Sequence, residues 1–243
     1  MTETISFLHI GKTGGTAVRT PIRDFLETGP DVVIELPMHR YGLKDVMEDS
    51  DTTKVMFFIR EPVSRFASGF NSRLRKGWPR HQGTWSKKEE EAFATFKTPN
   101  ELAEGLGANG WMMRHKARKA VQAIRHTRMA YEHYLGSVEL LEQARDRIFF
   151  VGAQETLDAD YEMMKKLLGM GPEYVLPRDD VGAHRTPDGF SKDISPEGRA
   201  NLEKYFAKDF EIYEWCRAYR EKMMQDLEMR LGAPVPADHN STS

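Results

Sequence analysis

The hydrophobic pattern of the chain begins with a change of period. Residues 4–10, TISFLHI, are apolar and β-branched, which is typical of a strand buried on both faces. A glycine-rich turn follows at 11–16, and apolar side chains then recur at helical spacing over 18–26 before Gly29-Pro30 ends the segment. The N-terminal pattern therefore predicts a strand, a tight turn and a helix.

Three further apolar runs have the length and composition of strands: VVIEL at 32–36, KVMFFIR at 54–60 and RIFFVGAQE at 147–155. The second run leads through Glu61-Pro62 into a helical pattern, and the third leads into another at 157–168. Strands that alternate with helices pair in parallel through right-handed crossovers. We expect an α/β fold with a doubly wound parallel sheet of about four to five strands, flanked by helices.

The long segment between the third and fourth strands is mostly helical in pattern. We expect a helical insertion at about 77–146 within a single domain that spans 1–232. A further helical stretch begins at Ser195, where a serine cap precedes a proline. The polar, proline-bearing end at 233–243 is expected to be a disordered tail.

Composition narrows the classes of protein. The chain is 40% hydrophobic and 30% charged, and no apolar run approaches the ~18 residues that span a bilayer. The start, MTETISF, lacks the pattern of a secretory signal, so we expect a cytoplasmic protein without a membrane partner. The single cysteine, Cys216, excludes an internal disulfide, and a net charge of −2 argues against a nucleic-acid partner.

The charge is unevenly distributed along the chain. Residues 73–88 and 114–128 each hold six Lys/Arg and no acid. Such runs are commonly solvated faces, and the alternative is a surface for an anionic ligand or substrate.

The turn at 11–16 has the chemistry of an anion site. Backbone N–H groups converge at the start of a helix, and the helix dipole adds partial positive charge there. Lys12 contributes a full charge, and Thr13 and Thr16 contribute hydroxyl donors. These groups together predict a phosphate-binding loop.

The motif of nucleotide triphosphatases is incomplete in this chain. Gly11-Lys12-Thr13 is preceded by Ser6 where that motif has its first glycine, and neither the second nor the third strand ends in an aspartate for magnesium. An NTP-dependent, kinase-like enzyme therefore stays as the alternative. The histidines have no neighbouring carboxylate or cysteine at ligand spacing, so no metal is expected. His9, on a buried strand, is expected to be a core residue.

Two segments resemble motifs of the sulfotransferases that use 3′-phosphoadenosine 5′-phosphosulfate. HIGKTGGTAVR resembles their phosphosulfate loop, and FFIREPVSRFASGF at 57–70 resembles their 3′-phosphate motif, a strand ending in arginine followed by a helix that carries serine. The resemblance is to the carbohydrate, heparan 2-O-type branch, sulfotransferase family 2, in a soluble, bacterial-like form. It extends to FVGAQETLD and to the segment from His184 to Trp215, and it implies a P-loop-like, nucleotide-binding fold.

The resemblance implies a donor, its binding residues and its product, adenosine 3′,5′-bisphosphate. The 3′-phosphate would be held by Arg60 and Ser68, and Arg185 would approach the nucleotide. Gly11 replaces a usual proline and Ala17 a usual serine, so contacts at position 17 are limited to the backbone. The residues that would hold the 5′-phosphosulfate are Lys12, Thr13, Gly14, Gly15 and Thr16.

The expected reaction is in-line transfer of a sulfuryl group to an acceptor hydroxyl, without a metal. Lys12 is the candidate for the charge on the leaving group. His39, after the second strand, is where related carbohydrate sulfotransferases place their base, and Glu35 is the rival. The resemblance implies that the acceptor is a glycan, and the basic insertion favours an anionic acceptor. A further alternative is that the chain is a non-catalytic, nucleotide-binding member of the fold.

Overall fold

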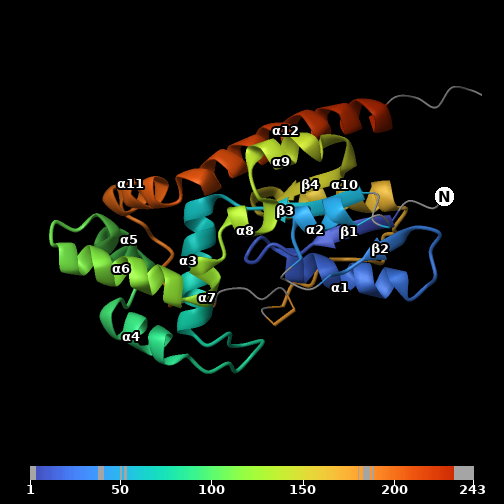
Figure 1. The fold of residues 1–243 in the computed structure, drawn as a ribbon. Helices are drawn as coiled ribbons and strands as arrows, with labels where there is room; N and C mark the ends of the chain where they lie inside the picture. Colours follow the sequence, from blue (N-terminus) through green and yellow to red (C-terminus); the bar gives the residue numbers. More distant parts are fainter. Residues whose placement is uncertain are drawn as a thin grey trace, which may run out of the picture.

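Four parallel strands form the central sheet of the computed structural model, which describes residues 4–37, 41–49, 51, 54–179, 181–182, 187 and 189–232 (Figure 1). The strand order within this part of the chain is β2-β1-β3-β4, and helices cover both faces. The predicted α/β fold with a parallel, helix-flanked sheet is confirmed. The strands are β1 (Thr4–Leu8), β2 (Val33–Glu35), β3 (Lys54–Ile59) and β4 (Ile148–Ala153).

The strands are buried on both faces because their alternate side chains enter two different cores. Phe7 and Phe58 pack against α1 and α10, whereas Phe57 and Ile59 pack against the helices of the other face. The helices of the first face are α1 (Gly15–Leu26) and α10 (Leu157–Leu168), and those of the second are α2 (Leu43–Glu48), α8 (Tyr131–Leu135) and α9 (Val138–Gln143). Short 3₁₀ turns, η1 (Arg145–Arg147) and η2 (Gln154–Thr156), flank β4.

The strand order reverses between β1 and β3. From β1 the chain crosses to β2 on one side, and β3 later leads toward β4 on the other. In open α/β sheets the carboxyl ends of the two strands at such a reversal border the ligand crevice. The two phosphate-binding motifs predicted from the sequence follow these same two strands.

The helices after β3 build a lobe beside the sheet (Figure 1). They enclose a third core, which α3 and α11 share with the predicted insertion, and α8 and α9 return to the sheet. The lobe comprises α3 (Pro62–Leu74), α4 (Lys87–Thr95), α5 (Pro99–Gly107), α6 (Trp111–Ala123), α7 (Arg125–Arg128) and α11 (Pro196–Tyr205).

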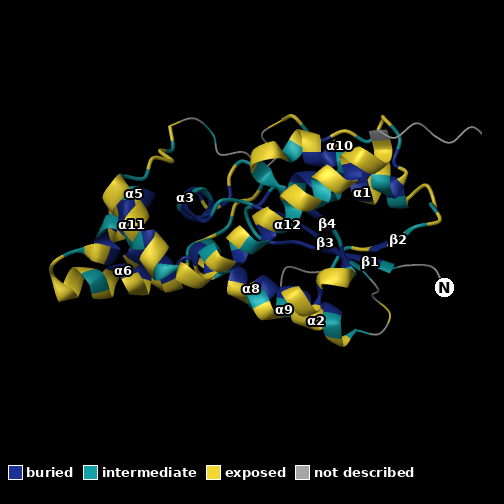
Figure 2. Ribbon diagram, turned by 90° about the horizontal axis from the view of Figure 1, so that it is seen from above, coloured by how far each residue is buried: buried dark blue, intermediate teal, exposed yellow. Residues whose placement is uncertain are grey.

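The helical stretch expected from Ser195 is divided at Phe206 into α11 and α12 (Ala207–Gly232). Helix α12 runs from the lobe across the sheet, and its outer side is largely exposed (Figure 2). Among the described helices, none combines the length and the apolar character that a membrane crossing requires. The expected disordered tail, 233–243, lies outside the described residues.

Candidate functional site

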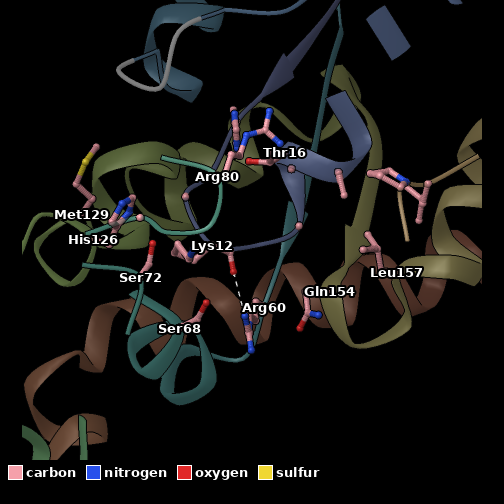
Figure 3. Close-up of a pocket in the computed structure, with 18 of the residues that line it drawn as sticks. Lys12, Thr16, Arg60, Ser68, Ser72, Arg80, His126, Met129, Gln154 and Leu157 are labelled. Atoms are coloured by element: carbon pink, nitrogen blue, oxygen red, sulfur yellow. Dashed lines mark hydrogen bonds between the residues drawn. The ribbon is translucent and has the colours of Figure 1, made fainter. Parts of the chain in front are cut away.

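A cavity of about 1020 Å³ opens at the carboxyl ends of β1 and β3. Its walls come from the loop after β1, from α3 and the segment after it, and from the start of α10 (Figure 3). Lys12, Gly14, Gly15, Thr16, Arg60 and Ser68, all predicted from the sequence, line it together.

The loop after β1 has a conformation that L-residues rarely adopt. Lys12 has φ 71° and Gly14 has φ 88°, both in the left-handed region. Gly14 caps α1, and its carbonyl accepts from the N–H groups of Ala17 at 2.9 Å and Val18 at 3.3 Å. Gly15 and Thr16, the first two residues of α1, line the cavity at the positive end of the helix dipole.

Gly15 lies where a side chain has no room, because a Cβ there would be 2.7 Å from Cδ2 of His9. We expect Gly15→Ala to displace the start of α1 and, while the fold persists, to weaken binding of a phosphate-bearing ligand by about tenfold or more; the probe is adenosine 3′,5′-bisphosphate, which the sequence resemblance implies. Titration calorimetry measures the change. Gly110→Ala is the control, since its Cβ would meet nothing within 4 Å; equal affinities of the two variants would contradict the role assigned to the loop.

Lys12 is a half-buried cation with cationic neighbours. Burial, then the charges of Arg75 and Arg60, lower the pKa of Lys12 to about 7. Within the described residues no carboxylate pairs with its amine. A dianion bound in the cavity would relieve this repulsion.

Arg60 and Ser68 approach the cavity from the second motif. Nε of Arg60 donates to Oγ of Ser64 at 2.8 Å, and one of its terminal nitrogens lies 3.5 Å from the carbonyl oxygen of Lys12. Ser68 lines the cavity two turns along α3. Ser72, which the sequence analysis missed, lines it one turn further. The i, i+4 spacing from Ser68 was the signal that would have found it.

A buried network ties the two motifs together. Arg65 donates through Nε to the carbonyl of Gly11 at 3.0 Å and through a terminal nitrogen to the carbonyl of Met129. Its other terminal nitrogen lies 3.6 Å from Asp209 at the start of α12. Asp209 accepts from the N–H of Tyr131 at 2.8 and 2.9 Å, and burial raises the pKa of its carboxyl.

The hydroxyl of Tyr131 completes this network at Arg60. It accepts from the Arg60 N–H and donates to the Arg60 carbonyl, both at 2.7 Å. The positions of Gly11 and Arg60 thus depend on α8 and α12, which lie far from them in the sequence.

Some predicted residues lie away from the cavity or outside the described residues. The hydroxyl of Thr13 donates to the carbonyl of Ile10 at 2.9 Å, so it supports the loop. Glu35 is exposed on edge strand β2 and does not line the cavity. His39 and Arg185 lie outside the described residues.

The structure shows the contacts of His9 and of the segment that precedes His39. His9 is 7% exposed, as expected for a core residue, yet its ring packs under Gly15 and lines the cavity. Both terminal nitrogens of Arg19 donate at 2.8 Å to the carbonyls of Leu36 and Pro37, which holds this segment to α1.

The two basic runs divide between the cavity and solvent. Arg73 pairs with Glu89, with 2.7 Å between Nε and the carboxylate oxygen. Burial raises the pKa of Glu89, but the hydrogen bonds from Arg73 outweigh burial and lower this pKa to about 2. Lys87 and Lys88 are exposed. The members that line the cavity are Arg73, Lys76, Arg80 and Arg125, and His81 and His126 from the same segments lie beside them.

The cavity lining is strongly cationic. Of its carboxylates, Glu155 accepts from the N–H of Glu61 at 2.7 Å and Asp158 pairs with Arg178 at 3.2 Å. Among the residues whose positions are given, no group of three or more His, Cys, Asp or Glu is arranged to hold a metal ion. The arrangement suits a ligand with more than one anionic group.

Comparison with known proteins agrees with this geometry. The model of the sulfotransferase family matches residues 2–216. No curated protein and no solved structure gives a significant match. The matched region contains the loop after β1, the Arg60 motif and the network that joins them. Because the family model matches most of its length, the chain belongs to the sulfotransferase family.

Proposed function

We propose that the protein transfers a sulfuryl group from 3′-phosphoadenosine 5′-phosphosulfate to the hydroxyl of an acceptor. Membership of the family supports sulfuryl transfer, and the choice of donor rests on one observation. Two separate sets of anion-binding groups, the Lys12 loop and the Arg60–Ser68 pair, open into one cavity. A donor with anionic groups at both ends of its ribose matches two such sets.

The residues of the cavity fit this donor. Lys12, Thr16 and the first N–H groups of α1 would hold the 5′-phosphosulfate. Arg60 and Ser68 would hold the 3′-phosphate. Leu157, Leu176 and Pro177 give the same cavity an apolar wall suited to adenine.

The proposed chemistry is a displacement at sulfur. The acceptor oxygen bonds to sulfur as the bond from sulfur to the phosphate oxygen breaks, and the acceptor proton passes to a base. Negative charge grows on the departing oxygen, where Lys12 acts as a fixed cation. His39 is the proposed base and Glu35 the alternative.

The proposed acceptor is an anionic molecule with a free hydroxyl, and a glycan fits this description. Beyond the two donor motifs, Lys76, Arg80 and Arg125 add positive charge to the cavity. Arg80 also donates to the carbonyls of Val181 and Gly182, at 3.3 and 3.1 Å, which supports a defined position for it. An acceptor with a carboxylate or sulfate group would meet these cations.

His39→Ala is expected to erase the rise of rate with pH that a neutral histidine base produces. That rise has its midpoint at about pH 6.5 for an unperturbed imidazole. Donor binding should survive, because the proposed mechanism assigns His39 to the acceptor hydroxyl and not to the phosphates of the donor. The measurement is kcat from about pH 5 to about pH 9, on both sides of that titration.

Glu35→Gln is the comparison for that experiment. A carboxylate base would place the midpoint at lower pH. If His39→Ala kept both rate and profile while Glu35→Gln abolished turnover in a folded protein, the base would be Glu35.

The test of the proposed function uses a donor labelled in its sulfur and a panel of hydroxyl acceptors, with and without EDTA. We expect label to pass to an anionic acceptor and EDTA to have no effect. A requirement for magnesium together with phosphate transfer from ATP would favour the kinase-like alternative. Tight binding of adenosine 3′,5′-bisphosphate without transfer to any acceptor would favour a non-catalytic member.

A further inference from the structure

Arg75 is a buried charge without a partner. It follows the last residue of α3 and is 8% exposed. None of its three guanidinium nitrogens has a hydrogen-bond partner within the part of the chain that the structure describes. An unpaired buried charge is costly, and native proteins retain one where a ligand or a function uses it.

The position of Arg75 beside the cavity is fixed by its backbone. Its N–H donates to the carbonyl of Asn71 at 3.1 Å, and its carbonyl accepts from Trp78 at 3.0 Å. Its neighbours Ser72 and Lys76 line the cavity wall. Arg75 itself is behind that wall, since it is not among the lining residues.

The charge of Arg75 acts on Lys12. Burial lowers the pKa of the Lys12 amine most, and the charge of Arg75 lowers it next, ahead of the charge of Arg60. No acid pairs with Lys12 or Arg75 within the described residues, although Arg60 has Glu61 and Glu155 near it. Lys12 and Arg75 are therefore two cations on the same side of the cavity without a paired acid among the described residues.

We infer that Arg75 is a positioning residue of the donor site: a cation buried without a counter-ion next to the cavity wall of Ser72 and Lys76, whose field attracts the phosphosulfate end of the donor. This inference rests on the proposed function. Because its nitrogens are covered, Arg75 acts through space rather than by contact. A fixed charge in a partly desolvated site needs no reorganisation when an anion arrives.

The inference predicts that one substitution changes stability and binding in opposite directions. Arg75→Met removes the charge and keeps much of the volume, so the free protein should melt at a higher temperature. The same change should weaken binding of adenosine 3′,5′-bisphosphate by about tenfold or more. Arg75→Lys keeps the charge and should bind within about threefold of the unchanged protein.

The experiment compares the unchanged protein, Arg75→Met, Arg75→Lys and Arg118→Met by titration calorimetry with adenosine 3′,5′-bisphosphate and by thermal melting. Arg118 is an exposed member of the second basic run, and its loss should change neither quantity. Absence of binding by the unchanged protein would count against the proposed function itself. Given that binding, three results would each overturn the role of Arg75: Arg75→Met binding within threefold, equal weakening in Arg75→Lys, or a melting temperature of Arg75→Met below that of the unchanged protein.

Discussion

Lys12→Ala is expected to lower kcat by about 10²–10³-fold while the Kd of adenosine 3′,5′-bisphosphate changes far less. The reason is that the proposed mechanism assigns Lys12, in the loop before α1, to the charge that grows on the departing oxygen, so its contribution would be larger in the transition state than in the complex with product. Steady-state kinetics gives the ratio of kcat between the unchanged protein and the variant, and calorimetry on the same preparation gives the ratio of Kd. The comparison is made below pH 7, where Lys12, with a pKa of about 7, carries its proton.

Arg60→Ala is the matched variant and should show the reverse pattern. The proposed 3′-phosphate partner of Arg60 does not change in the reaction, so loss of Arg60 should remove roughly 1.5–3 kcal/mol of binding with a smaller effect on kcat. A Lys12→Ala protein that turned over at the unchanged rate would contradict the mechanism.

Arg65→Met is expected to cost about 3–5 kcal/mol of the free energy of unfolding. It leaves Asp209 buried without its cation and frees the carbonyl of Gly11. Both Arg65 and Asp209 are almost fully buried, so water cannot replace the lost partner without a rearrangement. Denaturation by urea measures the loss.

Arg199→Met is the control for Arg65, because its pair with Glu61, at 3.0 Å, is near the surface and should be worth at most about 1 kcal/mol. Adding Asp209→Leu to Arg65→Met should restore part of the stability, since it removes the unpaired carboxylate. Equal losses in Arg65→Met and Arg199→Met would show that the buried network does not hold the motifs.

The parts of the site that the sequence predicted are local ones. The turn at 11–16 and the start of α3 depend on neighbouring residues: Pro62 occupies the first turn, and the Glu61 carboxylate accepts from the N–H of Ser64 at 2.7 Å. Such caps can be predicted from sequence because their partners lie within one helical turn. The alternation of apolar strands with helices also predicted the parallel sheet, because the period of each segment depends only on neighbouring residues.

The parts that the sequence did not predict depend on contacts between distant segments. Tyr131 and Asp209 are 78 residues apart, and nothing in either local pattern indicates that they meet. Arg75 belongs to a run whose exposed members, such as Lys87, look the same in sequence. Only the packing of the lobe against the sheet separates a buried cation from a solvated one.

The proposed function requires that one cavity binds a nucleotide through two anion sites without a metal. Titration calorimetry in EDTA, comparing adenosine 3′,5′-bisphosphate with adenosine 5′-monophosphate, tests it most directly. The proposed function predicts that the bisphosphate binds and that the monophosphate binds about tenfold more weakly or worse, because Arg60 and Ser68 then lack their proposed partner. Equal affinity for the two nucleotides, or binding of the bisphosphate only when magnesium is present, would contradict it.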